Sequence, residues 1–163
     1  MKILYYGGQK SGKSRLAEEK AIKLSETKPH YIATYDNSFN DDEMKERIGK
    51  HQGQRQEHFI TIEESYDLHR VIKTGETYLI DCISMWIFNT LDRREEELLA
   101  QLDTISKIDA NIIFVLNDVN SGIIPLEKES RKYVDMSGII GQKLAALCDE
   151  VYEAKLGLEI KLK

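Results

Sequence analysis

One glycine-rich segment near the amino terminus constrains the fold more than any other part of the sequence. From Gly7 to Ser14 the chain reads Gly-Gly-Gln-Lys-Ser-Gly-Lys-Ser, which matches the pattern G-x-x-x-x-G-K-[ST]. The residues before it, 2–6, are mostly apolar or aromatic and favour a strand. The residues after it, 13–25, are helix formers with apolar side chains at helical spacing. The sequence therefore predicts a strand, a tight loop and a helix in direct succession.

Each residue type in this segment suits phosphate binding. Glycines let backbone N–H groups curve around phosphate oxygens, and the amino end of the following helix adds partial positive charge. Lys13 can reach the outer phosphates, and Ser14 offers a hydroxyl to Mg²⁺. The alternative, a glycine-rich turn with an incidental lysine, would arise by chance in roughly 1 in 200 chains of this length. The pattern predicts a nucleoside triphosphate site that contains Gly7, Gly8, Gln9, Lys10, Ser11, Gly12, Lys13 and Ser14.

Short apolar segments alternate with helical segments along the rest of the chain. The run 112–116 is β-branched and aromatic, as in strands that are buried on both faces of a parallel sheet. We expect an α/β fold in one catalytic domain, 1–163, with a mostly parallel central sheet flanked by helices and a C-terminal β-hairpin around Gly157. The expected strands are 2–6, 30–34, 59–62, 78–81, 112–116 and two within 150–163; the expected helices are 13–25, 41–56, 65–73 and a helical stretch that ends near 107.

Composition and charge limit the classes of partner. Lys and Arg total 23 against 28 for Asp and Glu, and the resulting net charge of −5 argues against a nucleic-acid surface. The longest apolar stretches, such as 112–116, are too short to cross a bilayer. We expect a cytoplasmic protein that binds small molecules, with no nucleic-acid partner and no membrane span.

A metal-bound nucleotide needs a second acidic group, usually at the end of a strand near the phosphate loop. Asp81 ends the expected strand 78–81, so Ser14 and Asp81 are the candidate Mg²⁺ ligands. The alternative is that Asp81 caps the next helix, because aspartate is also a good N-cap residue. Position in the sequence leaves both interpretations open.

A histidine lies between two arginines on the expected helix 41–56. Arg47, His51 and Arg55 are spaced four residues apart and so share one helix face with Glu43. Flanking guanidinium groups would lower the pKa of the imidazole and bind phosphoryl oxygens, as a histidine nucleophile at phosphorus requires. The alternative is a solvated helix face on which Glu43 pairs with Arg47 and His51 has no chemical role.

Several short motifs follow one another along nearly the whole chain. They are G-G-x-x-S-G-K-S-R from Gly7, Y-I-A-T from Tyr31, D-E-M-x-x-R-I-x-x-H-x-x-x-R from Asp42, T-x-E from Thr61, L-I-D-C from Leu79, G-I-I-P from Gly122 and D-E-V from Asp149, with Gly157 and Lys163 near the end. In this order and combination they resemble the adenosylcobinamide kinase / adenosylcobinamide-phosphate guanylyltransferase family of cobalamin biosynthesis.

The resemblance implies a bifunctional enzyme with a RecA-like P-loop NTPase fold. Such an enzyme phosphorylates adenosylcobinamide with ATP or GTP and then transfers GMP from GTP to that phosphate through a GMP-histidine intermediate, for which the matching residue is His51. It also implies a homo-oligomer, with a trimer as the expected form and active sites near subunit boundaries. The other residues that the resemblance places beside the nucleotide are Ala33, Thr34, Tyr35, Gln52, Gly53, Gln54, Arg55, Glu63 and Asp81.

The chain departs from the family pattern in its carboxy-terminal half. Where members usually read N-E-V-G-x-G, this chain has Asp118 and Asn120 at the second and fourth positions. Val134 stands in the usual R-D pair and Gly141 in the usual N-Q pair. Two alternatives therefore stay open: a P-loop guanylyltransferase or kinase for a different small-molecule alcohol or phosphate, and a nucleotide-binding regulatory homologue without turnover.

Overall fold

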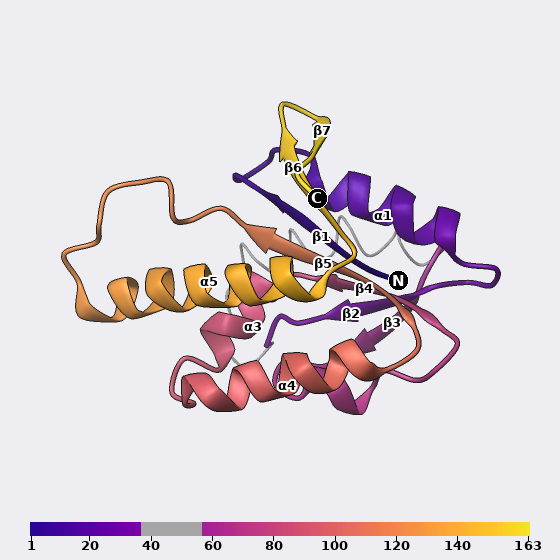
Figure 1. The fold of residues 1–163 in the computed structure, drawn as a ribbon, viewed down its shortest axis with the longest axis horizontal. Coiled ribbons are helices and arrows are strands. Elements are labelled where there is room, and N and C mark those ends of the chain that lie inside the picture. Colours follow the sequence, from indigo (N-terminus) through magenta and orange to yellow (C-terminus); the bar gives the residue numbers. More distant parts are fainter. Residues whose placement is uncertain (37–56) are drawn as a thin grey trace.

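The computed structural model describes residues 1–36 and 57–163 (Figure 1). The expected helix 41–56 lies outside the described residues. So do the site candidates His51, Gln52, Gly53, Gln54 and Arg55 and the flanking Arg47.

A mostly parallel sheet forms the centre of the described structure. Its seven described strands follow the order β3-β2-β4-β5-β1-β6-β7, and only the last pair, β6 with β7, is antiparallel. Strands β1, β5 and β4 are parallel, so the segments that follow β1 and β4 leave the sheet at the same edge, the carboxyl ends of the strands. Strand β5 separates the two segments. A sheet of this kind, with the phosphate-loop segment after β1, is a mostly parallel α/β architecture. The strands are β1 (Lys2–Gly7), β2 (His30–Ala33), β3 (Ile60–Glu63), β4 (Thr77–Asp81), β5 (Asn111–Asn117), β6 (Glu150–Lys155) and β7 (Leu158–Lys161).

Helices cover both faces of the sheet (Figure 1). Helix α1 (Lys13–Leu24) packs on one face through Ala17 and Ala21. The other face is covered by α3 (Ile83–Asn89), α4 (Glu95–Lys107) and α5 (Lys128–Leu147). The α/β class, the mostly parallel sheet with flanking helices and the C-terminal hairpin are thus confirmed. None of the helices in the described ranges has the length and apolar character that a membrane crossing requires.

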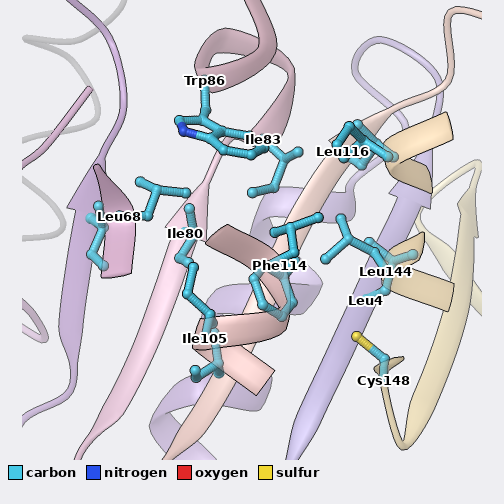
Figure 2. Close-up of a cluster of buried hydrophobic side chains, with 14 of the residues drawn as sticks. Leu4, Leu68, Ile80, Ile83, Trp86, Ile105, Phe114, Leu116, Leu144 and Cys148 are labelled. Atoms are coloured by element: carbon cyan, nitrogen blue, oxygen red, sulfur yellow. The ribbon is translucent and has the colours of Figure 1, made fainter. Parts of the chain in front are cut away.

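The core follows the two-residue period of the strands. On β5, Ile112 and Phe114 face α3, α4 and α5, whereas Ile113 and Val115 face α1. Figure 2 shows the larger cluster, in which Trp86 of α3 lies over the strands with its side chain fully buried. Two buried apolar layers, one on each face, hold the sheet rigid, so that the loops at its carboxyl edge start from fixed points.

The predicted helix 65–73 is wrong. Only a single 3₁₀ turn, η2 (Leu68–Arg70), forms there. The carbonyl of Tyr66, which a helix would use internally, instead accepts hydrogen bonds from Trp86 Nε1 at 2.9 Å and Gln101 Nε2 at 3.2 Å. Contacts with distant helices therefore override the local helical pattern.

The C-terminal hairpin turns through two residues with positive φ. Lys155 pairs with Leu158, and the residues between them, Leu156 and Gly157, have φ values of 55° and 81°. A type I′ turn requires this geometry, for which Asn-Gly is the preferred pair. Leucine at the first position is disfavoured because its Cβ crowds the backbone.

Leu156→Asn is expected to raise the free energy of unfolding by about 1 kcal/mol, because asparagine tolerates positive φ better than leucine does. Urea denaturation measures the change as a higher midpoint at constant slope. Leu158→Asn, an exposed residue of β7 with ordinary strand geometry, is the matched control and should not stabilise. A lower midpoint for Leu156→Asn would contradict the turn assignment.

A carboxylate ties the hairpin to α1. Glu150 accepts hydrogen bonds from Lys20 at 3.0 Å, Tyr152 at 3.0 Å and Lys161 at 3.2 Å. These donors, Lys20 first, lower the pKa of Glu150 to about 2. A carboxyl whose pKa is lower in the folded protein stabilises the fold above its unfolded pKa and loses that contribution as the pH falls.

Glu150→Gln should therefore lower the free energy of unfolding at pH 7, and the difference from the unsubstituted protein should shrink as the pH falls from about 4.5 towards 2. Denaturation curves at several pH values measure this difference. Glu26→Gln, an exposed residue in the loop after α1, serves as the control with little expected effect. A difference that does not change with pH would mean that the ion pairs do not supply the stabilisation.

Candidate nucleotide-binding site

The phosphate loop connects β1 directly to α1, as the sequence predicts. Ser11 N–H donates to the Gly8 carbonyl at 3.2 Å, which closes the loop, and Leu16 N–H donates to the Gly12 carbonyl at 3.1 Å as the first bond of the helix. Gly12 has φ 96°, a conformation that glycine adopts without strain. In the described structure no side chain caps the amino end of α1, so its first N–H groups are available to an anion.

Lys13 lies across this loop. Its side chain is only 6% exposed, and Nζ donates to the Gly8 carbonyl at 3.0 Å. Burial lowers the pKa of the Lys13 ammonium, and the negative charge of Asp81 partly offsets that lowering. A buried cation with one neutral acceptor and a carboxylate nearby is suited to receive a phosphate group.

Asp81 stands at the carboxyl end of β4, on the same edge of the sheet as the loop. Tyr31 donates from its hydroxyl to Asp81 Oδ2 at 3.2 Å, which orients the carboxylate. The N-cap position of α3 is Cys82, and within the described residues no side chain caps that helix. The structure therefore does not support the alternative in which Asp81 is a helix cap.

Thr34 joins the ends of β2 and β4. It is fully buried, its hydroxyl donates to the Cys82 carbonyl at 2.8 Å, and the same oxygen accepts the Cys82 N–H at 3.0 Å. Asn89 Nδ2 donates to the Thr34 carbonyl at 2.6 Å. These bonds fix the chain where it leaves β4, immediately after Asp81.

The remaining described candidates lie at the same edge. Ala33 ends β2 and pairs with Asp81 on one side and with Glu63, the last residue of β3, on the other. Glu63 is exposed. The Tyr35 hydroxyl is buried and has no hydrogen-bond partner among the residues that the structure describes. The sheet thus brings β2, β3 and β4 candidates to the edge where the phosphate loop leaves β1.

A second polar cluster at this edge was not among the predicted site residues. Asp118 follows β5; its N–H donates to the Gly7 carbonyl at 2.8 Å, and its carboxylate accepts from Ser121 Oγ at 2.8 Å and from the Tyr6 hydroxyl. Burial would raise the pKa of Asp118, but hydrogen bonds from Tyr6 and Ser121 lower it. A carboxylate directly after a buried strand was the sequence signal that could have identified this cluster.

Two of the departures from the family pattern contact each other. Asn120 Nδ2 donates to the Val134 carbonyl at 2.8 Å and lies 3.2 Å from the position that a Cβ on Gly138 would take. Gly141 lets α5 approach β5, because a Cβ there would lie 3.3 Å from Leu116 Cδ2. The loop after β5 and helix α5 are therefore adapted to each other in this chain.

Comparisons with known proteins identify the family of the chain. The family model described as cobinamide kinase / cobinamide phosphate guanyltransferase matches residues 3–162. A relative from Pseudomonas aeruginosa, named bifunctional adenosylcobalamin biosynthesis protein CobP, is 36% identical and aligns over 100% of this chain and 98% of its own length. One from Escherichia coli K12, named bifunctional adenosylcobalamin biosynthesis protein CobU, is 31% identical over 100% of both chains.

Among solved structures, the KaiC-like protein PH0186 from Pyrococcus horikoshii OT3 superposes with a TM-score of 0.47 and 15% identity, over 93% of this chain and 69% of its own. The family match spans nearly all of the sequence and includes the phosphate loop, Asp81 and the hairpin. The chain therefore belongs to the cobinamide kinase / cobinamide phosphate guanyltransferase family.

Proposed function

We propose that this protein phosphorylates adenosylcobinamide and then transfers GMP from GTP to the new phosphate. The observation that carries the proposal is the buried Lys13, which lies across the phosphate loop beside Asp81 in a chain that matches the family over 3–162. Residues 1–163 would act as one catalytic domain in the cytoplasm.

In the kinase step, the alcohol oxygen of adenosylcobinamide attacks the γ-phosphorus of ATP or GTP. The bond from the γ-phosphorus to the bridging oxygen breaks, the nucleoside diphosphate leaves and the alcohol proton is released. Lys13 and the N–H groups at the start of α1 stabilise the negative charge that moves to the bridging oxygen. The buried ammonium of Lys13 would stabilise this charge by electrostatic attraction.

In the guanylyl transfer step, a nitrogen of His51 attacks the α-phosphorus of GTP, and pyrophosphate leaves. A phosphate oxygen of the phosphorylated corrinoid then attacks the same phosphorus and displaces His51. The spacing of Arg47 and Arg55 around His51 supports this role, because both cations favour the neutral imidazole and can bind phosphoryl oxygens. Gln52, Gly53, Gln54, Ala33, Thr34, Tyr35 and Glu63 would complete the nucleotide site.

The described residues fit a bound Mg²⁺. The described ranges contain no group of three or more His, Cys, Asp or Glu side chains that could hold a metal. In phosphate-loop sites, however, Mg²⁺ needs only one or two protein oxygens besides those of phosphate and water. The Ser14 hydroxyl and the Asp81 carboxylate would supply them. Bound there, Mg²⁺ would neutralise charge on the phosphates.

We also infer a homo-oligomer, with a trimer as the expected form. Ile160 and Leu162 expose apolar side chains on β7 and the chain end after it, and β7 is an edge strand among the described strands. Such a surface supports contact between copies of the chain. Light scattering at several concentrations measures the mass of the assembly.

Product analysis tests the proposed function. With adenosylcobinamide and ATP alone, the phosphorylated corrinoid should accumulate; after addition of GTP, it should convert to the GDP-linked corrinoid with release of pyrophosphate. The second candidate is the same chemistry on another alcohol or phosphate, which the contact between Asn120 and Val134 favours because both positions depart from the family pattern. Absence of any corrinoid product, together with covalent labelling by GTP, would support that second candidate.

A further inference from the structure

We propose that the turn of the C-terminal hairpin, Leu156–Gly157, positions the phosphate loop by holding the Ser11–Gly12 peptide group in the orientation that binds phosphate. The inference rests on the proposed binding of nucleotide at this loop. It gives a role to Gly157, which belongs to the family pattern but to no step of the proposed chemistry.

The hairpin lies against the phosphate loop and the start of α1 through four contacts. Gly157 N–H donates to the Ser11 carbonyl at 2.9 Å, and Arg15 Nη2 donates to the Gly157 carbonyl at 3.1 Å. A Cβ on Gly12 would lie 3.0 Å from Gly157 Cα, and a Cβ on Gly7 would lie 2.4 Å from the Ala154 carbonyl oxygen. A Cβ on Gly7 would overlap the Ala154 carbonyl and one on Gly12 would crowd Gly157, so glycine at both positions lets the loop approach the hairpin closely.

The hydrogen bond to Ser11 determines where the next N–H points. The Ser11–Gly12 peptide bond is trans, so the Ser11 carbonyl and the Gly12 N–H point in opposite directions. Because the carbonyl faces the hairpin, the Gly12 N–H faces away from it. The Ser11 N–H is already bonded to Gly8, so the Gly12 N–H is the donor that the hairpin makes available to a phosphate oxygen.

The hairpin is a fixed support because side-chain and backbone contacts hold it against β1. Tyr5 of β1 donates from its hydroxyl to Glu159 at 2.8 Å and stacks on Tyr152 with ring centroids 5.2 Å apart. Strand β6 pairs directly with β1, the strand from which the loop starts. The loop and the turn that supports it are thus anchored on adjacent strands.

Gly157→Ala isolates this role. Gly157 has φ +81° with nothing within 4 Å of the added Cβ, so the substitution disturbs only the backbone conformation of the turn. Gly75→Ala is a matched control: Gly75 has φ +84°, equally open space, and a position before β4, at the opposite edge of the sheet from the loop. Gly157→Asn should restore function, because asparagine tolerates positive φ.

The experiment compares GTP affinity by calorimetry with exchange of the Ser11 amide in nucleotide-free protein. Gly157→Ala should raise the Kd for GTP about tenfold, the loss of one hydrogen bond to a charged group, and should speed exchange at Ser11. Gly75→Ala should lower the melting temperature as much as Gly157→Ala does, but it should change neither the Kd for GTP nor the exchange at Ser11. Gly157→Asn should recover most of the affinity for GTP.

Unchanged affinity and exchange in Gly157→Ala would overturn the inference, as would equal weakening in Gly75→Ala. If the unsubstituted protein failed to bind GTP, the proposed function would fail instead. The exchange rate at Ser11 would then still decide whether the hairpin orders the loop.

Discussion

Lys13→Ala is expected to reduce the rate of phosphoryl transfer by at least about 100-fold, or about 2.7 kcal/mol in the activation free energy. The substitution removes the buried ammonium that lies across the phosphate loop, 3.0 Å from the Gly8 carbonyl. It also leaves Asp81 without the cation that offsets its charge, next to incoming phosphates. The measurement is kcat/KM for the kinase step with ATP or GTP, together with the Kd for the nucleotide.

The melting temperature of Lys13→Ala distinguishes a loss of catalysis from misfolding. Burial lowers the pKa of Lys13, so the folded protein holds this charge at a cost, and the alanine variant should melt at the same or a higher temperature. Lys23→Ala removes an exposed lysine from the last turn of the same helix and should retain full activity. A Lys13→Ala enzyme with near-normal kcat/KM would refute the phosphate-loop role.

The second large effect concerns His51. His51→Ala should abolish transfer of GMP to the phosphorylated corrinoid, because no other group in the proposed mechanism forms the covalent intermediate. The kinase step should continue at a rate close to normal, since Lys13, Ser14 and Asp81 remain. The measurement is the ratio of phosphorylated to GDP-linked corrinoid, which should rise until only the phosphorylated product forms.

His58→Ala is the matched control for this substitution. His58 lies seven residues after His51 in the sequence and is exposed in the turn before β3. It should retain both steps. GDP-linked product from His51→Ala at an unchanged rate would show that transfer is direct, without a histidine intermediate.

The phosphate loop and the parallel sheet were predictable because local rules determine them. The motif fixes the order strand, loop and helix around Gly7 to Ser14, and the apolar run of β5 is typical of a central strand. The hairpin around Gly157 was predictable from its strand alternation. Its contact with Ser11 was not, because sequence patterns do not show which distant segments meet.

Other parts depended on long-range contacts. The expected helix 65–73 reduces to a 3₁₀ turn because Trp86 and Gln101 use the Tyr66 carbonyl. Helix α5 was not predicted, since Gly138 and Gly141 weaken its local propensity, although Met136, Ile140 and Leu144 have helical spacing and are buried. Asp118 departs from the family pattern in the sequence, and its N–H donates to the Gly7 carbonyl, a long-range contact that the sequence pattern does not show.

Intact-mass spectrometry after incubation with GTP and Mg²⁺ detects the proposed GMP adduct on His51. The chain should gain the mass of one GMP as pyrophosphate is released. The adduct should be acid-labile and base-stable, and it should form in His58→Ala but not in His51→Ala. Binding of GTP without any covalent adduct, or an adduct that persists in His51→Ala, would contradict the proposed role of His51.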